Sequence, residues 1–297
     1  MYKNLKNSKQ ETPKGYVSDS TEEQERLIKQ DNLFKKFDDE IWNKLLKDKK
    51  KLDILDVGCN CGNLIFDRVG GRHEYRNIVG IDYYKDNIDF ANKNFGSANR
   101  HFYLCDVEDI SLENSLKMIM DQNNIKKFDI IHLSLILLHL KEPQKLLERL
   151  KDFLGDSGTI LIKDVDDGLN FAYPDENKDF DRIYEICSID NKSGDRRTGR
   201  KLYSYLTNAG YDNVKIEKIG QNSINLSEEE KLNMYDVYFS FILANAEERK
   251  NEFPQNKKYQ EDWEWFSQNY EKLKNKFLEK DFIFNLGLMA FTASPKK

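Results

Sequence analysis

Cysteine is scarce in this chain: its 297 residues contain four, at irregular spacing, which excludes a scaffold stapled by disulfides. No apolar run approaches the length of a membrane span, and the first residues lack the apolar core of a signal peptide. Positive charge is not in surplus either, because the formal net charge is -5. A mildly acidic balance disfavours nucleic-acid phosphates as the main ligand. We therefore expect a cytoplasmic protein with no membrane and no nucleic-acid partner.

Ligands for a metal ion are also lacking. Cys59 and Cys61 form a C-x-C pair, which by itself suggests a metal site. A structural zinc site takes four ligands, however, and no second Cys or His pair stands at ligand spacing in the sequence. We expect no metal.

A short apolar run that ends in a glycine turn is the first positive signal. Residues 52–57 fit a buried strand, and Gly58 and Gly62 then let the backbone pass close to a ligand. The next strand, residues 77–82, ends on Asp82, about twenty residues past the turn. An acid at that distance is typical of the ribose acceptor in a nucleotide-binding βαβ unit.

Strands and helices alternate from there on. The expected strands are residues 52–57, 77–82, 101–105, 128–133 and 158–163, and the expected helices are residues 62–69, 86–95, 111–121 and 143–154. Such alternation predicts a parallel sheet covered by helices on both faces. Ligands of these sheets lie beyond the carboxyl ends of the strands, where Gly58, Asp82, Asp106 and Ser134 all stand.

The glycine turn differs from the dinucleotide fingerprint, because Asn60 stands where the middle glycine would be. With Asp56 as its acidic residue, the turn resembles motif I of the class I S-adenosylmethionine-dependent methyltransferases. Asp106 and Val107 match the positions that meet adenine in that family. The resemblance covers roughly residues 52–220 and is nearest to the ubiquinone/menaquinone methyltransferase-like, small-molecule group.

This resemblance implies an α/β fold with a doubly wound, mostly parallel, seven-stranded Rossmann-like sheet. It also implies S-adenosylmethionine as cofactor and a small molecule as methyl acceptor. The residues that it places at the cofactor are Tyr16, Arg26, Gln30, Asp56, Gly58, Cys59, Asn60, Gly62, Asp82, Tyr83, Asp106, Val107 and Ser134. Tyr16, Arg26 and Gln30 equally fit the surface of an amphipathic helix.

Four regions follow along the chain. They are a helical cap (1–50), the cofactor-binding core (51–222), a helical insertion (223–281) and a final strand (282–297). In the plain family fold the last two strands follow each other directly, so the insertion is the distinguishing feature. Its aromatic side chains fit three roles: packing onto the sheet, walling a substrate pocket as a lid, or facing a homodimer partner.

Methyl transfer asks the protein to align a nucleophile and, where needed, to remove a proton. His139, after the fourth strand, and Asp164, at the end of the fifth, are the candidate catalytic residues. A structural role for His139 and a solvated turn for Asp164 are the alternatives. The sequence leaves open whether oxygen, nitrogen or carbon is methylated. An RNA or protein acceptor and a noncatalytic cofactor-binding scaffold are the alternative functions.

Overall fold

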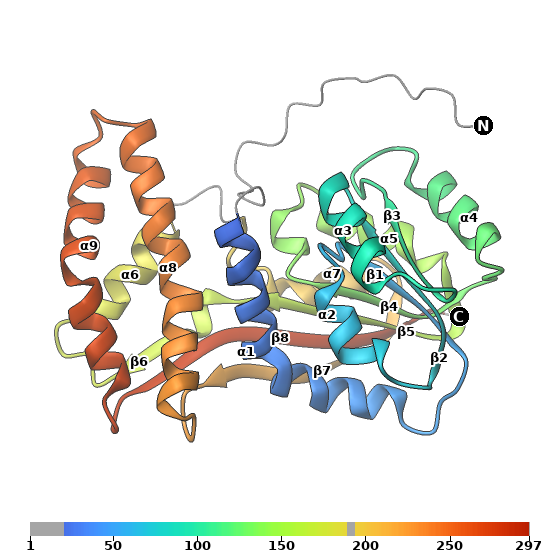
Figure 1. Cartoon of the computed structure of the whole chain (residues 1–297), viewed down its shortest axis with the longest axis horizontal. Coiled ribbons are helices and arrows are strands. Elements are labelled where there is room, and N and C mark those ends of the chain that lie inside the picture. Colours follow the sequence, from blue (N-terminus) through green and yellow to red (C-terminus); the bar gives the residue numbers. More distant parts are fainter. Residues whose placement is uncertain (1–20, 189–193, 297) are drawn as a thin grey trace.

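The computed structural model describes residues 21–188 and 194–296, and these form one eight-stranded sheet flanked by helices (Figure 1). The strands are β1 (Leu52–Val57), β2 (Tyr75–Asp82), β3 (Arg100–Leu104), β4 (Phe128–Ser134), β5 (Leu154–Val165), β6 (Phe171–Tyr173), β7 (Tyr211–Asn222) and β8 (Ile283–Pro295). Their order is β3-β2-β1-β4-β5-β8-β6, and β7 pairs with β8 outside this order. Strands β5 and β6 pair with different stretches of β8, and β7 pairs along most of its length. The first five strands are parallel, whereas β8 runs antiparallel to each of its neighbours.

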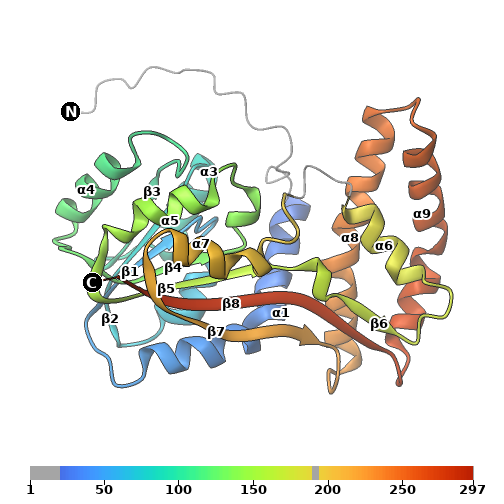
Figure 2. The ribbon, with the colours of Figure 1, turned by 180° about the vertical axis from the view of Figure 1, so that it is seen from behind.

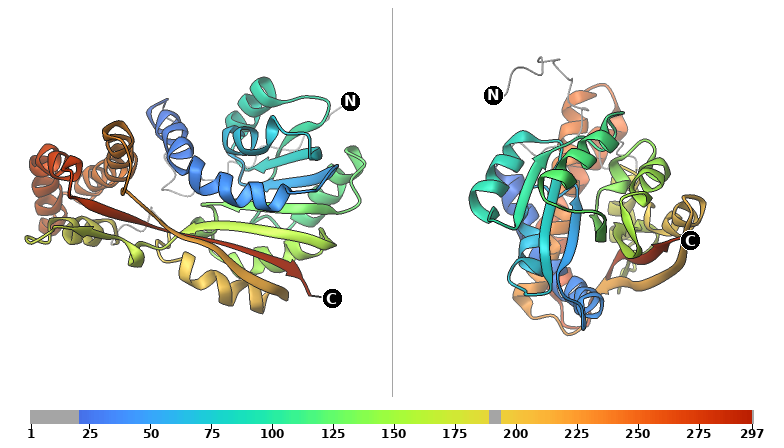
Figure 3. Two further views of the ribbon diagram at one scale, coloured as in Figure 1. Left: turned by 90° about the horizontal axis from the view of Figure 1, so that it is seen from below. Right: turned by 90° about the vertical axis from the view of Figure 1, so that its right-hand side faces the viewer.

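Helices cover both faces of this sheet. They are α1 (Thr21–Leu46), α2 (Asn63–Ile65), α3 (Lys85–Phe95), α4 (Leu112–Gln122), α5 (Pro143–Lys151), α6 (Asp179–Ser188), α7 (Leu202–Asn208), α8 (Glu228–Glu252) and α9 (Lys257–Leu278). Buried side chains of α1, α3, α6, α8 and α9 share one core, and those of α4, α5 and α7 share the other. Figure 3 shows α1 and α7 on opposite faces of the sheet. The doubly wound, mostly parallel architecture is therefore confirmed.

Two details differ from the sequence-based expectation. The sheet has an eighth strand, β6, whose three residues are too few to carry a periodic signal. The helix expected at residues 62–69 is instead one turn, α2, that continues into a π-helical turn, η1 (Phe66–Gly70).

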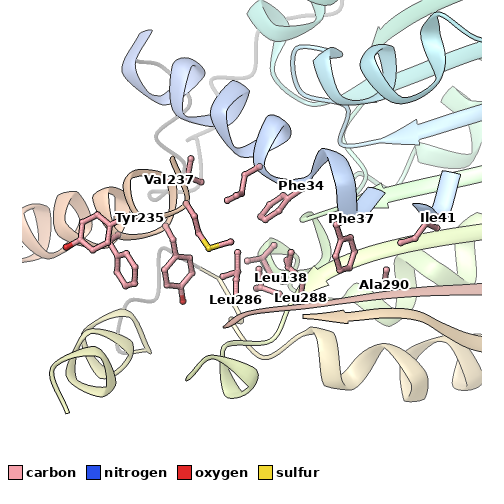
Figure 4. Close-up of a cluster of buried hydrophobic side chains, with 14 of the residues drawn as sticks. Phe34, Phe37, Ile41, Leu138, Tyr235, Val237, Leu286, Leu288 and Ala290 are labelled. Atoms are coloured by element: carbon pink, nitrogen blue, oxygen red, sulfur yellow. The ribbon is translucent and has the colours of Figure 1, made fainter. Parts of the chain in front are cut away.

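The insertion forms a helical hairpin at the end of the sheet remote from β3 (Figures 1 and 2). Ser227 and Glu230 form a capping box that begins α8. Five of the eleven aromatic side chains of the hairpin are buried, and four more are partly buried against the same core. They contact one another and the rings of Phe180 and Phe284. Figure 4 shows the same core continuing along β8 from Tyr235 of α8 to Phe37 of α1. Core packing therefore accounts for most of these aromatics.

A buried ion cluster fixes α1 to the sheet. Lys163 of β5 places its Nζ 2.7 and 2.9 Å from the two carboxylate oxygens of Asp38. Arg68 of η1 donates to the same carboxylate from Nε at 3.3 Å and Nη2 at 3.2 Å. All three side chains are buried. One acid of α1 thus compensates two interior cations from different elements.

Asp38→Ala leaves Lys163 and Arg68 buried without their shared acid, so we expect the free energy of unfolding to fall by about 3–5 kcal/mol. Denaturant titration followed by circular dichroism measures it. Asp39→Ala is the control, because Asp39 pairs with the partly exposed Lys35 and its loss is expected to change the free energy by less than about 1 kcal/mol. Equal effects of the two variants would contradict the role given to Asp38.

Candidate active site

The glycine turn is held against the end of β2 by its own backbone. The amides of Gly58 and Cys59 both donate to the carbonyl of Ile81, at 2.8 and 3.0 Å. Gly58, Asn60 and Gly62 have φ values of 70, 48 and 78°, the left-handed region that favours glycine and tolerates asparagine. This sequence of conformations turns the chain sharply from β1 into α2 at the carboxyl edge of the sheet.

Asp82 closes the same turn from the neighbouring strand. Its Oδ2 accepts from the amide of Asn60 at 3.0 Å, and its Oδ1 accepts from the amide of Tyr84 at 2.9 Å. Burial raises the pKa of Asp82, and these backbone hydrogen bonds oppose the rise. Since each carboxylate oxygen offers about two acceptor positions, Asp82 keeps capacity for further donors.

The end of β3 lies beside Asp82. The amide of Cys105 donates to the Asp82 carbonyl at 2.8 Å, which places Asp106 and Val107 next to the turn. One oxygen of Asp106 accepts from the amide of Glu108 at 2.9 Å, and within the described residues nothing donates to the other. Val107 is 8% exposed and offers an apolar surface. The predicted strand ends therefore meet at one edge.

The ends of β1 and β4 add two buried polar atoms that lack a partner. Asp56 is 3% exposed; its Oδ1 lies 2.7 Å from Nδ1 of His132, while its Oδ2 has no hydrogen-bond partner among the described residues. The hydroxyl of Ser134 is likewise buried and unpartnered there. Buried polar atoms are nearly always hydrogen-bonded in proteins. These two therefore mark a place where a ligand or solvent supplies the missing partner.

The other predicted cofactor residues lie in different surroundings. Tyr16 falls outside the described residues, and Tyr83 is exposed beside the start of α3. Arg26 donates to Gln30 at 3.0 Å, and its guanidinium lies 5.5 Å from the ring centroid of Phe241 in α8. The structure thus places Arg26 against the insertion, with Gln30 hydrogen-bonded to it.

Cys59 and Cys61 are buried free thiols of the turn. Burial raises the pKa of Cys61 to about 11, so this thiol stays protonated and inert at neutral pH. Among residues 21–188 and 194–296, no three His, Cys, Asp or Glu side chains are grouped to hold a metal ion. No described helix is long and apolar enough to cross a membrane.

Asp31 is a charged residue near this edge that the sequence did not reveal. Burial raises the pKa of its carboxyl to about 7, against the lowering effect of Lys163 and Arg68. Its spacing of three and seven residues from Phe34 and Asp38 is a signal that it shares their helix face. The sequence alone does not single out Asp31, because the ion pair between Asp38 and Lys163, which shows where that helix face lies, is visible only in the structure.

On the other side of the edge, residues 194–199 strap two loops together. The amide of Asp195 donates to the carbonyl of Leu138 at 2.7 Å, in the turn η2 (Leu137–His139) after β4. The carbonyl of Arg196 accepts from the amide of Asp167 at 2.7 Å, in the turn η3 (Asp167–Leu169) after β5.

The side chain of Arg196 also joins the strap to α8. Its Nε and Nη2 lie 2.8 and 3.0 Å from the two oxygens of Asp167. The guanidinium lies 5.9 and 5.3 Å from the ring centroids of Tyr238 and Phe241. The hydroxyl of Tyr238 donates to Asp167 at 3.2 Å and accepts from Asn170 at 2.6 Å. Part of the insertion therefore does border the edge, through Tyr238 and Phe241.

The two candidate catalytic residues lie in opposite environments. Asp164 is fully buried and accepts from the amides of Val165 and Leu138 at 2.8 and 3.2 Å. Both the catalytic role and the solvated turn considered for Asp164 are contradicted, because its carboxylate is enclosed by protein and supports the turn that carries His139. Burial raises the pKa of Asp164 to about 7.

His139 is reachable from solvent at the end of η2. The surrounding protein atoms and then the charge of Arg196 lower the pKa of its imidazole to about 4, so the ring is neutral at pH 7. Of the two candidates, His139 alone is exposed.

The comparisons with known proteins agree with this geometry. A family described as "Methyltransferase domain" matches residues 48–210. The chain belongs to this family. A curated relative, methyltransferase str2 of Strobilurus tenacellus, is 32% identical over 81 residues, which make up 27% of this chain and 30% of the relative. The match thus spans less than a third of either protein.

Solved structures share the fold at low identity. The [4+2]-cyclase SpnF has a TM-score of 0.50 at 15% identity, over 87% of this chain and 81% of the cyclase. The YcgJ protein of Bacillus subtilis has a TM-score of 0.50 at 13% identity, over 87% of this chain and 98% of that protein. At such identities the likeness shows the fold alone.

Gly194→Ala is expected to loosen the strap. Gly194 has a φ of 73°, and a Cβ there would lie 2.3 Å from the carbonyl oxygen of Leu138. The left-handed conformation alone costs an alanine about 1–2 kcal/mol, so the melting temperature should fall by several degrees. Gly71→Ala, where a Cβ meets nothing within 4 Å, is the matched control. Identical melting of the two variants would show that the strap does not depend on Gly194.

Proposed function

We propose that this chain transfers the methyl group of S-adenosylmethionine to a small-molecule acceptor. The observation that carries the proposal is the hydrogen bonding of Asp82 to the amide of Asn60, which joins the carboxylate to the glycine turn. The family match adds that such an edge belongs to a methyltransferase domain. A cytoplasmic location is part of the proposal and is supported by four free, buried cysteines.

The residues at this edge fit the cofactor. The remaining acceptor positions of Asp82 suit the ribose hydroxyls, and the second oxygen of Asp106 suits the adenine amino group, with Val107 against the ring. The unpartnered atoms of Asp56 and Ser134 offer acceptors for the aminoacyl end. When bound, S-adenosylmethionine supplies an already activated methyl group on its sulfonium.

The chain then has to orient the acceptor and keep water away. His139, held by η2, presents a neutral ring that accepts a hydrogen bond from an acceptor hydroxyl or amine. Tyr238 and Phe241 add an aromatic wall that Arg196 holds in place. Because a pKa of about 4 makes His139 a weak base, we infer that it orients the acceptor more than it removes a proton.

Charge pairing favours a small acceptor over RNA. Arg196 and Arg200, two cations at the loop after β5, form bidentate pairs with Asp167 and Asp166. A cation that is already neutralised by a carboxylate contributes little to binding a phosphate backbone. The bulk net charge of -5 points the same way.

A noncatalytic or differently catalytic role is the second candidate, because a [4+2]-cyclase shares this fold and the fold does not decide the reaction. Formation of S-adenosylhomocysteine from S-adenosylmethionine, measured with a panel of small hydroxyl, amine and activated-carbon acceptors, separates the two. Cofactor binding without turnover on any acceptor class would favour the scaffold.

Asp82→Ala is expected to weaken S-adenosylmethionine binding roughly 100-fold, because two charge-assisted hydrogen bonds to the ribose are lost. Isothermal titration calorimetry measures the affinity. Asp86→Ala is the control, since Asp86 lies exposed in the first turn of α3. A melting curve verifies that the turn survives the loss of Asp82. Undiminished binding by a folded Asp82→Ala variant would rule out the proposed cofactor position.

His139→Ala is expected to lower kcat at least tenfold while leaving cofactor affinity unchanged, because the proposal assigns His139 to the acceptor and not to the cofactor. Since the pKa of His139 is about 4, its protonation is confined to acid, and the wild-type rate should show no inflection from this ring between pH 5.5 and 8. Steady-state kinetics against pH test both statements. An inflection near pH 6.5 that the variant lacks would contradict the second.

A further inference from the structure

Asp31 stands on α1 over the carboxyl edge of the sheet. It shares a helix face with Phe34 and Asp38, and Lys163 Nζ lies 4.8 Å from the Phe34 ring centroid and 2.7 Å from Asp38. These contacts tie that face to a strand position two residues before the end of β5.

The direction of α1 places Asp31 beyond that strand end. Along β7, Glu217 pairs with Lys44, whereas Gln221 donates to the carbonyl of Leu33, so α1 runs antiparallel to β7 and therefore to β5. Seven residues separate Asp31 from Asp38, which is roughly 10 Å along the helix. Asp31 thus overhangs the edge where the glycine turn lies.

Counting Asp31 itself, three acids lie around two cations. Lys163 of β5, Arg68 of η1, Asp38 of α1 and Asp56 of β1 are the charged groups whose fields reach Asp31. Both cations are engaged by Asp38. Arg68 also donates a hydrogen bond to Asp31, but to its backbone carbonyl oxygen and not to its carboxylate. From the described part of the chain, the Asp31 carboxylate receives no hydrogen bond.

Asp56 provides an independent sign that a hydrogen-bond donor belongs here. It is 3% exposed, its Oδ1 is taken by His132, and its Oδ2 has no described partner. A buried carboxylate oxygen without a donor is costly unless something donates to it. A ligand with several N–H donors on one cation satisfies both acids at once.

We propose that Asp31, together with Asp56, binds the α-ammonium group at the aminoacyl end of S-adenosylmethionine. The inference rests on the proposed function and adds a binding residue from the helix that covers the site. An ammonium has three N–H donors, enough for one bond to each acid and one more. In this arrangement the cofactor lies under α1 and contacts Asp31. Arg26 borders the insertion instead, with Gln30 hydrogen-bonded to it.

The direct test compares ligands with and without the aminoacyl end. Calorimetry of Asp31→Asn should show roughly tenfold or greater weakening for S-adenosylhomocysteine, the loss expected of a charge-assisted hydrogen bond. Methylthioadenosine, which lacks the aminoacyl group, should bind both proteins equally. Asp39→Asn, on the outer face of the same helix, is the control and should change neither affinity.

The number of protons released on ligand binding tests the same contact independently of the affinity. The pKa of Asp31 is about 7 without ligand, and a bound ammonium favours the ionised carboxylate and lowers it. Binding of S-adenosylhomocysteine below pH 7 should therefore release a proton, seen by titration in buffers of different ionisation enthalpy. Affinity should fall up to tenfold per pH unit below 7 and level off above it. Asp31→Asn should abolish the release.

Three outcomes would overturn the inference and leave the proposed function standing. They are unchanged S-adenosylhomocysteine affinity in Asp31→Asn, equal loss for methylthioadenosine, and weakening of S-adenosylmethionine alone, which would indicate a sulfonium contact. Failure of the unaltered chain to bind any of the three ligands would remove the proposed function itself. Misfolding is not expected to obscure the result, because replacing an acid whose pKa is raised by burial should hold or raise the melting temperature above pH 7.

Discussion

The shared carboxylate of Asp38 is the interaction on which the arrangement around the site depends. It lies between Lys163 of the central sheet and Arg68 of the turn that follows the glycine loop, and all three side chains are buried. Without it Lys163 would lose its described carboxylate partner, and Arg68 would keep only the half-exposed Asp67. Because Asp38 belongs to α1, compensating these charges also fixes the height and direction of the helix above the carboxyl edge. The N-terminal helix is therefore part of the site's framework.

The opposite border of the site is built on a similar physical basis, a partly buried charge that is paired and hydrogen-bonded. Arg196 is paired by Asp167, packed against two rings of α8, and joined through the strap to the turn that carries His139. Tyr238 connects the same acid to Asn170, whose side-chain oxygen accepts from the amide of Gly287 in β8. The insertion thus reaches the site through one polar network, while most of its aromatics serve the core.

The proposed cofactor side and the proposed acceptor side of the site consist of different kinds of groups. The glycine turn and Asp82 present backbone and carboxylate groups that suit a polar ligand common to many proteins of this fold. The loops after β4 and β5, the strap and α8 contribute the side chains of His139, Arg196, Tyr238 and Phe241. Because one fold supports different reactions, we expect the reaction to depend on the second group of residues. Substrate choice in this family member should accordingly follow changes in α8 and the strap.

By itself the sequence determined the order of strands and helices, the glycine turn and the acids at the strand ends. These features are local: apolar periodicity and glycine placement act within a few residues. Only the tertiary structure decided that Asp164 points inward, that β6 joins the sheet, and that Asp31 overhangs the edge. Lys163 and Asp38 stand 125 positions apart, and no local pattern marks them as partners. Burial and charge compensation are properties of the packed chain, so they appear only after distant elements meet.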